Sequence, residues 1–414
     1  MISSIRDLTL TKVNKKLKER QIVFPFFLYN DKILLDKLNS LKWVNKMKKV
    51  LILTTSTGQG HNQAAKSLMD SFSKQGYECI RYDFLGYNSN IVKNIITKGY
   101  EISASKLPHI YGLIYKYSDI KSIHSFLNIV FNKSTKKIND QIQKVKPDII
   151  IGTHPLSVNI ICNLKKKGLN IPFISVVTDF KAHYTYVNDL VDTYITASDF
   201  TKQSLIERNI NPNIIYPLGI PIKESFYDFD DNIPLIKQKN YFNLLLMSGS
   251  MGLSNISYVV DELLKNPNNL RITVVCGNNK KLEQSLQKKS KEIYNNKILH
   301  ILGFSNDIAS LMEYSDILIS KPGGLTVTEA MVKNLPLIIP FAIPGQESEN
   351  VEFLTETGIA YYVPDLSKLN QTVNTLIENP SLISEMKNNL KNVVSKYSLD
   401  RIVTIANDLI EKDN

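Results

Sequence analysis

The stretch that most constrains the fold covers residues 317–350, ILISKPGGLTVTEAMVKNLPLIIPFAIPGQESEN. Its pattern predicts a buried strand, a turn at Gly323 and Gly324, a helix, a second buried strand and a polar loop, an order typical of a nucleotide site in a parallel α/β sheet. We expect Thr326 to cap the helix, with Glu329 at capping-box spacing. The Glu329 carboxylate could also accept hydrogen bonds from two hydroxyls, such as those of a ribose. A plain structural turn and a nucleotide site are both open at this point.

Short apolar runs followed by polar turns and helix patterns recur along the chain, and each run predicts a buried strand. In the first half the runs lie at residues 50–54, 148–152, 173–177, 194–197 and 214–221. In the second half they lie at residues 242–247, 272–276, 299–303, 317–320, 337–340 and 360–363. The acidic, turn-rich residues 223–241 separate the two series and mark a linker. The sequence therefore predicts an α/β fold with two Rossmann-like domains.

We place the N-terminal domain at residues 47–225 and the C-terminal domain at residues 226–390, with residues 391–414 as a helix that could pack back on the N-terminal domain. The chain has 414 residues, of which 43% are apolar, so each domain can bury a core. Residues 1–46 show no clean apolar period. We expect them to be an extension of uncertain order, or a consequence of a start site placed upstream of a true start at Met47.

The spacing of the cysteines and the length of the apolar runs indicate the cellular compartment in which the chain works. Cys79, Cys162 and Cys276 are the three cysteines, and they are far apart with no CxxC pair. This spacing argues against a disulfide framework and a zinc site, and it fits a reducing cytoplasm. The longest apolar run, near residues 335–344, has about half of the roughly twenty residues that a membrane-spanning helix needs. We expect no transmembrane span and no secretory signal.

Positive charge is concentrated in two segments. Residues 1–49 hold twelve Lys or Arg against four acidic residues, and residues 88–146 hold ten Lys against three. In residues 87–146 the lysines alternate with aromatic residues, a composition that suits an anionic lipid surface. The plain alternative is a set of helices packed on the sheet with a solvated lysine face. Single-stranded nucleic acid is a less favoured partner, and we expect no nucleic-acid binding.

The first predicted strand runs into residues 56–61, STGQGH, and then into a helix. Glycines let a backbone approach a ligand closely, and a helix start offers free amides to an anion. The loop could therefore hold a phosphate or an acceptor head group. Its spacing matches neither GxGxxG nor a P-loop, so the motif alone is weak.

Ionisable residues follow two further predicted strands of the first half. Thr153 and His154 come after one strand, and Asp179 follows the next, with His183 shortly after. Ligands in open parallel sheets bind beyond the carboxyl ends of the strands, so these side chains could line one crevice. A histidine at a strand end can also be a hydrogen-bonded structural residue.

Five blocks then occur in a characteristic order: TSTGQGH, VVTDFKAH, MSGSMG, GFSNDIASLMEYSDILISKPGGLTVTEA and IPGQESEN. Together they resemble the monogalactosyldiacylglycerol synthase and processive diacylglycerol glucosyltransferase group of glycosyltransferase family 28, which belongs with the peptidoglycan N-acetylglucosaminyltransferase. The resemblance covers about residues 47–400. It implies a GT-B fold, in which two Rossmann-like domains face each other across a cleft and the C-terminal domain holds most of the nucleotide sugar.

The resemblance also implies roles for individual residues. Glu329 would bind the ribose hydroxyls, the turn at Phe304 and Ser305 would lie at the uracil, and residues 248–252 would hold the diphosphate. The full expected donor set is Gly60, Ser248, Gly249, Ser250, Gly252, Phe304, Ser305, Lys321, Gly323, Gly324, Thr326, Glu329, Gln346, Glu347 and Asn350. The expected acceptor set is Gly58, Gln59, His154, His183 and Tyr186, the last at a position where relatives carry tryptophan.

The implied reaction is inverting transfer of a hexose, with glucose favoured, from a UDP-sugar to diacylglycerol or a glycosyldiacylglycerol. His61 is the expected base, and Asp179 is its rival or orients the acceptor. Amides of the glycine loops would stabilise the leaving diphosphate, so no metal or other cofactor is expected. Diacylglycerol in a membrane and an anionic lipid surface are the expected partners, which implies a peripheral location on the inner face of the cell membrane.

Three alternatives stay open at the level of the sequence. The donor could be UDP-galactose, as in a monogalactosyldiacylglycerol synthase. The chain could transfer N-acetylglucosamine to a polyprenyl-linked peptidoglycan precursor, although the GQGH and TDFKAH blocks favour diacylglycerol. It could also be a nucleotide-sugar-binding membrane module without catalysis, although the joint presence of His61, Asp179 and Glu329 argues against a decayed site. Neither the number of sugars added nor the oligomeric state follows from the sequence.

Overall fold

The computed structural model describes residues 47–55, 59–84, 132–229, 240–247, 256–291 and 296–412. Residues Met1–Met47 and Lys48–Asn414 are two separate units, and every helix and strand described here belongs to the second. The predicted extension at residues 1–46, and residues 87–131 of the lysine- and aromatic-rich segment, lie outside the described residues.

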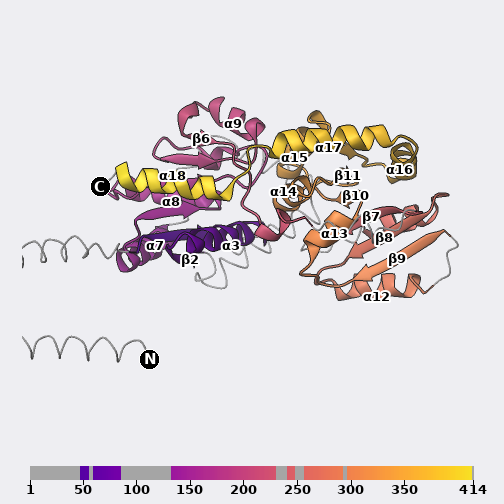
Figure 1. Cartoon of the computed structure of the whole chain (residues 1–414). Coiled ribbons are helices and arrows are strands. Elements are labelled where there is room, and N and C mark those ends of the chain that lie inside the picture. The colour runs from indigo at the N-terminus through magenta and orange to yellow at the C-terminus, as the bar shows by residue number, and fades with distance from the viewer. Residues whose placement is uncertain are drawn as a thin grey trace, which may run out of the picture. The chain divides into compact units, whose positions relative to one another are not determined.

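The first half of the chain builds a six-stranded parallel sheet with the strand order β2-β1-β3-β4-β5-β6. Its strands are β1 (Lys49–Thr54), β2 (Glu78–Asp83), β3 (Ile149–Gly152), β4 (Phe173–Val176), β5 (Thr193–Ile195) and β6 (Ile215–Tyr216). The helices of this half are α3 (Gln59–Lys74), α7 (Asn132–Val145), α8 (Pro155–Lys165) and α9 (Asp199–Ile206). The central strands β3 and β4 are fully buried, as expected for apolar strands covered by helices on both faces of a parallel sheet (Figure 1).

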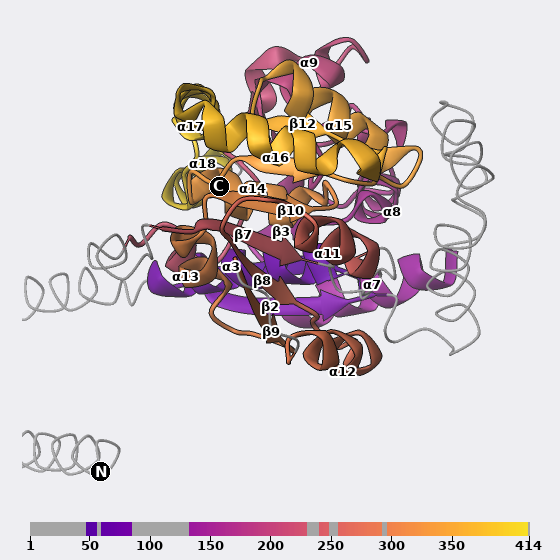
Figure 2. The ribbon, with the colours of Figure 1, turned by 90° about the vertical axis from the view of Figure 1, so that its right-hand side faces the viewer.

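The second half builds another six-stranded parallel sheet, with the strand order β12-β11-β10-β7-β8-β9. Its strands are β7 (Phe242–Met247), β8 (Leu270–Val275), β9 (Lys297–Leu302), β10 (Ile317–Ser320), β11 (Leu337–Ile339) and β12 (Ala360–Tyr362). The helices are α11 (Ile256–Leu264), α12 (Lys280–Lys289), α13 (Ile308–Tyr314), α14 (Gly324–Val332), α15 (Gln346–Glu356), α16 (Leu369–Glu378) and α17 (Pro380–Val394). Figure 2 shows this sheet from the side, with α12 beyond one edge and α16 and α17 towards the other.

The two halves share one apolar cluster. Ala64 and Phe180 of the first half are buried in the same cluster as Val327 and Phe353 of the second. The rings of Phe180 and Phe353 stack with their centroids 4.5 Å apart and their planes 7° from parallel. Because burial of a large aromatic side chain contributes on the order of 2 kcal/mol, this contact helps to hold the strand ends of the two halves together.

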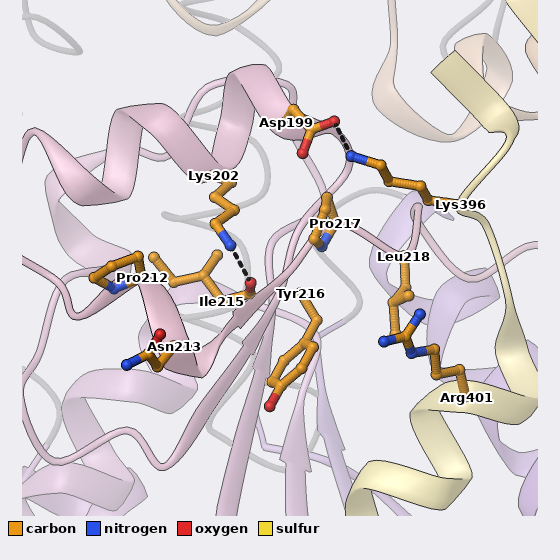
Figure 3. A pocket seen from close by; sticks show the side chains of 10 residues that line it. All are labelled: Asp199, Lys202, Pro212, Asn213, Ile215, Tyr216, Pro217, Leu218, Lys396 and Arg401. Carbon is orange, nitrogen blue, oxygen red and sulfur yellow. Dashed lines mark hydrogen bonds and ion pairs between the residues drawn. The ribbon is translucent and has the colours of Figure 1, made fainter. Parts of the chain in front are cut away.

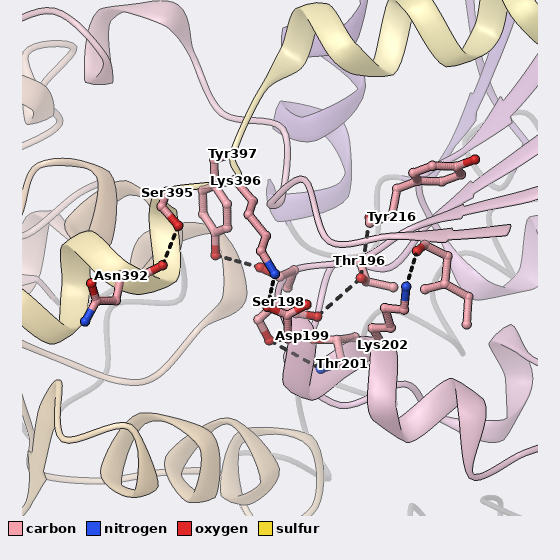
Figure 4. A network of polar contacts seen from close by, with 12 residues as sticks. Thr196, Ser198, Asp199, Thr201, Lys202, Tyr216, Asn392, Ser395, Lys396 and Tyr397 are labelled. Atoms are coloured by element: carbon pink, nitrogen blue, oxygen red, sulfur yellow. Dashed lines mark hydrogen bonds and ion pairs between the residues drawn. The ribbon is translucent and has the colours of Figure 1, made fainter. Parts of the chain in front are cut away.

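The chain returns from the second half to the first through residues 395–398, and α18 (Leu399–Lys412) then packs on the first sheet. Tyr397 donates a hydrogen bond from its hydroxyl to the Ala197 carbonyl at 2.6 Å (Figure 4). Its ring covers Gly219, where an added Cβ would meet ring atoms at 2.6 Å and where φ is +86°. Only glycine fits that position without strain. Tyr397 thereby fastens the return segment to the first half.

The edge strand β2 of the first sheet was not predicted. Strand β2 has the sequence ECIRYD, and none of its six residues is fully buried. It lies at the edge of the sheet, where a strand needs only one apolar face, so its apolar signal is weak. The predicted runs at 50–54, 173–177 and 242–247 correspond to β1, β4 and β7 within a residue at each end.

Candidate active site

His61 lies in the first turn of α3, and two neighbouring strand ends surround its ring. Its Nδ1 is 2.7 Å from the carbonyl oxygen of Thr153, which follows β3, and 3.1 Å from Oγ1 of Thr178, which follows β4. Strands β1, β3 and β4 are adjacent in the sheet, so their carboxyl ends bring these three residues together. The sheet order therefore explains why residues 92 and 117 positions away in the sequence meet at the His61 ring.

The hydrogen bonds of His61 define which of its nitrogens can act as a base. A carbonyl oxygen only accepts, so a nitrogen 2.7 Å from the Thr153 carbonyl must carry its hydrogen. In the neutral ring the lone pair is then on Nε2. Burial lowers the pKa of His61 to about 4, against a smaller opposing effect of the Thr153 hydrogen bond. At neutral pH the ring is uncharged, and its Nε2 can take a proton.

The other two predicted histidines cap helices. His154 is the N-cap of α8 and accepts from the Leu156 amide at 3.2 Å, while its ring lies 4.5 Å from that of His61. His183 is the N-cap of the short helix Tyr184–Tyr186 and accepts from the Thr185 amide at 3.2 Å. In both rings Nδ1 is the acceptor, the reverse of His61. These contacts agree with the structural interpretation of a histidine at a strand end.

Tyr186, a predicted acceptor residue, is 1% exposed. Its hydroxyl lies 3.2 Å from Thr178 Oγ1, and burial raises its pKa. The side chain therefore faces the residue that contacts His61. The Tyr186 hydroxyl is buried inside the first half.

Asp179 meets a residue of the second half. Its carboxylate accepts a hydrogen bond from the side-chain amide of Gln346, the first residue of α15. Burial raises the pKa of Asp179 to about 6, and the bond from Gln346 opposes that rise. A candidate catalytic residue and a candidate donor ligand, 167 positions apart, are thus in direct contact.

Glu329 lies in α14 and is 8% exposed. Burial raises its pKa to about 8, with Lys223 opposing the rise. Within the described part of the chain, no side chain or amide donates a hydrogen bond to this carboxylate. A nearly buried carboxylate without a protein partner is suited to accept from two ligand hydroxyls.

The predicted cap at Thr326 is wrong. Helix α14 begins at Gly324, its N-cap is Gly323, and no side chain makes a cap hydrogen bond. Thr326 is therefore the third residue inside the helix. The sequence pattern missed this because glycine, with no side chain to signal a cap, starts the helix.

Close approach of the two halves explains one glycine. A Cβ added to Gly324 would lie 2.2 Å from the Thr178 carbonyl oxygen, so the first turn of α14 rests directly on the backbone beside His61. Neighbouring Gly323 has more room, with the Lys321 Nζ as its nearest atom at 3.7 Å. A Cβ added to Gly60 would lie 3.9 Å from Leu325 Cβ, an ordinary contact distance.

Three predicted donor ligands contact the protein itself. Lys321 forms an ion pair with Glu347, whose other oxygen accepts from the Ile343 amide at 2.9 Å. Asn350 is 1% exposed, donates to the Pro322 carbonyl at 2.9 Å and accepts from the Phe180 amide at 3.1 Å. These contacts hold the loop around residues 321–323 against the loop around residues 341–345 and the start of α15.

The structure describes the side chains of only some of the remaining candidate residues. Phe304 is 63% exposed, and Ser305 Oγ accepts from the Asp307 amide at 3.2 Å. The following candidates lie outside the described residues, or have side chains that do: Gly58, Gln59, Ser248, Gly249, Ser250 and Gly252. No group of three His, Cys, Asp or Glu side chains among the described residues is arranged to hold a metal ion. In that same part of the chain, no helix is both long and apolar enough to cross a bilayer.

A cavity of about 440 Å³ lies elsewhere, where α9 and β6 of the first half meet the return segment (Figure 3). Its charged lining residues are Asp199, Lys202, Lys396 and Arg401. Two of these cations already have partners, because Lys396 pairs with Asp199 and Lys202 donates to the Ile215 carbonyl. None of the candidate site residues lines this cavity.

Two six-stranded parallel sheets with their helices, joined by a return segment, have the architecture of a GT-B glycosyltransferase. Two solved structures have this fold: MurG of Acinetobacter baumannii has a TM-score of 0.57 at 18% identity, covering 87% of this chain and 99% of that one. CalG4, the calicheamicin glycosyltransferase, has a TM-score of 0.60 at 10% identity, covering 89% and 99%. At these identities the likeness concerns the fold alone.

The sequence comparisons name the family. The model of monogalactosyldiacylglycerol (MGDG) synthase matches residues 61–222, and that of the glycosyltransferase family 28 C-terminal domain matches residues 243–401. The processive diacylglycerol beta-glucosyltransferase of Bacillus pumilus is 34% identical over 380 residues, which are 90% of this chain and 97% of that protein. This chain belongs to the family of monogalactosyldiacylglycerol synthases and processive diacylglycerol glucosyltransferases, as its sequence blocks predicted.

Proposed function

We propose that this protein is an inverting glycosyltransferase that moves glucose from UDP-glucose to diacylglycerol or a glycosyldiacylglycerol. The names of its relatives support the substrate class. The single structural observation that supports catalysis is the state of His61, a neutral ring with Nδ1 anchored on the Thr153 carbonyl and the lone pair on Nε2.

The proposed chemistry needs one base. The acceptor hydroxyl attacks the anomeric carbon of glucose from the side opposite the diphosphate, and the bond between that carbon and the diphosphate oxygen breaks. The hydroxyl proton passes to Nε2 of His61, and the electron pair of the broken bond leaves on UDP. Asp179, ionised above a pKa of about 6, directly follows Thr178, whose hydroxyl contacts His61, and is the proposed group that orients the acceptor.

Glu329 is the proposed ribose ligand. Two ribose hydroxyls donate best to an ionised carboxylate, whereas burial raises the pKa of Glu329 to about 8. Binding of the nucleotide sugar should therefore release a proton near neutral pH. The backbone amides at the start of α14, next to Gly323 and Gly324, are the proposed partners of the leaving diphosphate. We propose that this step needs no metal, which EDTA treatment followed by an activity assay tests.

The acceptor is a membrane lipid, so the enzyme must reach a bilayer. The lysines and aromatic residues of 88–146 are the proposed contact with anionic lipid, at the inner face of the cell membrane. Sedimentation with vesicles of increasing phosphatidylglycerol content measures this contact. Binding that does not depend on the anionic fraction would contradict it.

The direct test is incubation of the protein with diacylglycerol-containing vesicles and, separately, UDP-glucose, UDP-galactose and UDP-N-acetylglucosamine. We expect chromatography to show glucosyldiacylglycerol as the main product. Galactolipid alone would make the enzyme a monogalactosyldiacylglycerol synthase. No glycolipid from any of the three donors would contradict the proposed function. Product in a parallel incubation with a polyprenyl-linked peptidoglycan precursor would make that precursor the acceptor.

A further inference from the structure

We propose that Tyr186 and Thr178 are positioning residues that hold His61 in the tautomer with its lone pair on Nε2. This inference rests on the proposed function, in which His61 is the base. Neither residue touches a reacting atom; both act through the His61 ring.

The three side chains form a buried series of contacts. Tyr186 Oη is 3.2 Å from Thr178 Oγ1, which is 3.1 Å from His61 Nδ1. Tyr186 is 1% exposed and Thr178 is 8% exposed, so water does not readily replace either contact. A buried hydroxyl that loses its partner costs about 1–3 kcal/mol. The directions of these hydrogen bonds are therefore strongly constrained.

The direction of each bond follows from the partners. Either hydroxyl could donate in the contact between Tyr186 and Thr178. Because His61 Nδ1 carries a hydrogen, Thr178 Oγ1 can only accept from it, and the Thr178 hydroxyl hydrogen is directed to Tyr186 Oη. Since Nδ1–H already donates to the Thr153 carbonyl at 2.7 Å, Oγ1 is the second acceptor of the same hydrogen. Two acceptors on Nδ1–H favour this tautomer and stabilise the imidazolium that forms when Nε2 takes a proton.

Loss of the Tyr186 hydroxyl would free the Thr178 hydroxyl to turn. It could then donate its own hydrogen to Nδ1 in competition with the bond from Nδ1–H to the Thr153 carbonyl, which raises the population of the opposite tautomer with hydrogen on Nε2. That tautomer has no lone pair for the acceptor hydroxyl. The tyrosine hydroxyl therefore acts on catalysis through the direction of one threonine O–H bond.

The same threonine contacts the second half. The first turn of α14 rests on the Thr178 carbonyl, with no room for a side chain at Gly324. The residue that orients the base through its side chain is thus held by the donor half through its backbone. The proposed positioning pair lies between the two halves of the site.

The test compares Tyr186→Phe, Thr178→Val and Thr178→Ser in the full-length protein, with diacylglycerol in phosphatidylcholine vesicles as acceptor. We expect the first two to lower kcat about tenfold to a hundredfold, part of the 10²–10⁴ that a general base contributes. The KM for UDP-glucose should stay within about twofold, on the same reasoning that only the base is affected. Thr178→Ser, which keeps the hydroxyl, should retain most of kcat.

Nitrogen-15 NMR of the imidazole rings reads the tautomer directly, with the His61 signal assigned by its loss in His61→Asn. We expect a protonated-type Nδ1 in the wild type and in Thr178→Ser, and a shift towards the other tautomer in Tyr186→Phe. Tyr77→Phe is the matched control: Tyr77 is 6% exposed and hydrogen-bonds Asn407, so its loss affects the same half without touching His61. It should change thermal stability but neither kcat nor the His61 signal.

A double variant adds a second check on the same account. Because both residues act through one contact, Thr178→Val with Tyr186→Phe should be no slower than Thr178→Val alone. Unchanged kcat in Tyr186→Phe and Thr178→Val, or a fall in kcat with an unchanged His61 signal, would overturn the inference. Failure of the proposed function looks different: the wild type then makes no glycolipid, while the NMR comparison still measures the tautomer.

Discussion

The two halves of the site handle charge in opposite ways. Around His61 in the first half, burial keeps the ring neutral, and two uncharged groups, the Thr153 carbonyl and the Thr178 hydroxyl, contact its Nδ1. The second half contributes two nearly buried carboxylates: Glu347 is neutralised by Lys321, while Glu329 has no hydrogen-bond partner among the described residues and a raised pKa. The surroundings of His61 suit a base that accepts a proton, whereas those of Glu329 suit a carboxylate that accepts hydrogen bonds from ligand hydroxyls. We expect the two halves to fail in different ways when they are altered.

The largest effect should come from His61→Ala. Removal of the base should lower kcat about 10²–10⁴-fold, measured as glycolipid formed on vesicles. His300→Ala is the control, because His300 is an exposed histidine on β9. Turnover in His61→Ala within about threefold of the control would assign the base elsewhere and remove the contrast between the halves.

Glu329→Gln should mainly raise KM for UDP-glucose. Two hydrogen bonds to a charged acceptor contribute about 1.5–3 kcal/mol each, so we expect KM to rise tenfold or more. The exposed Glu356→Gln is the control. A loss of kcat with an unchanged KM would contradict the ribose role.

The protonation of Glu329 also makes donor binding depend on pH. With a pKa of about 8, more of the carboxylate ionises as pH rises from 6 to 8, so affinity for UDP-glucose should rise over that range and level off above it. The diphosphate of UDP-glucose does not titrate between pH 6 and 8, so a change in affinity over this range comes from a group of the protein. Calorimetry across this range should show the dependence in the wild type and its loss in Glu329→Gln; the same dependence in both proteins would contradict the assignment.

Adjacent glycines test the contact between the halves. Gly324→Ala places a methyl group 2.2 Å from the Thr178 carbonyl, so the backbone must shift, at a cost of about 1–3 kcal/mol in the free energy of unfolding. Gly323→Ala is the matched control, since its Cβ would meet nothing closer than 3.7 Å. Thermal melts should separate the two variants, and equal melting temperatures would show that the contact is not maintained in solution.

The smallest expected effect is a shift in a pH profile. The Gln346 amide holds down the pKa of Asp179, which burial raises to about 6. If the ionised carboxylate is the active form, activity falls as pH falls through that value. Gln346→Ala should therefore move the acidic limb of kcat/KM to higher pH, and an unmoved limb would exclude Asp179 as its source.

Much of the fold was predictable because buried parallel strands are almost wholly apolar. Strands β3 and β4 are four-residue buried runs that local sequence shows directly. Strand β2 was missed because an edge strand mixes charged and apolar residues. Family resemblance supplied the candidate residues, and the glycine turn at residues 323–324 was recognisable from the sequence alone.

The contacts of the site were not predictable, because they join residues that are distant in sequence. Asp179 meets Gln346, and His61 meets Thr153 and Thr178, only after two sheets have formed with a particular strand order. The sequence showed Glu347 as a polar loop residue but not its ion pair with Lys321. Thr178 directly precedes the predicted catalytic residue Asp179 in the block VVTDF. That neighbour was the only local indication that Thr178 lies beside His61.

The division of work between the halves is tested most directly by calorimetric titration of UDP-glucose into the wild type, His61→Ala and Glu329→Gln at pH 7. The account predicts that His61→Ala binds the donor with an affinity within about twofold of the wild type, whereas Glu329→Gln loses tenfold or more. A loss of affinity in His61→Ala as large as that in Glu329→Gln would contradict it.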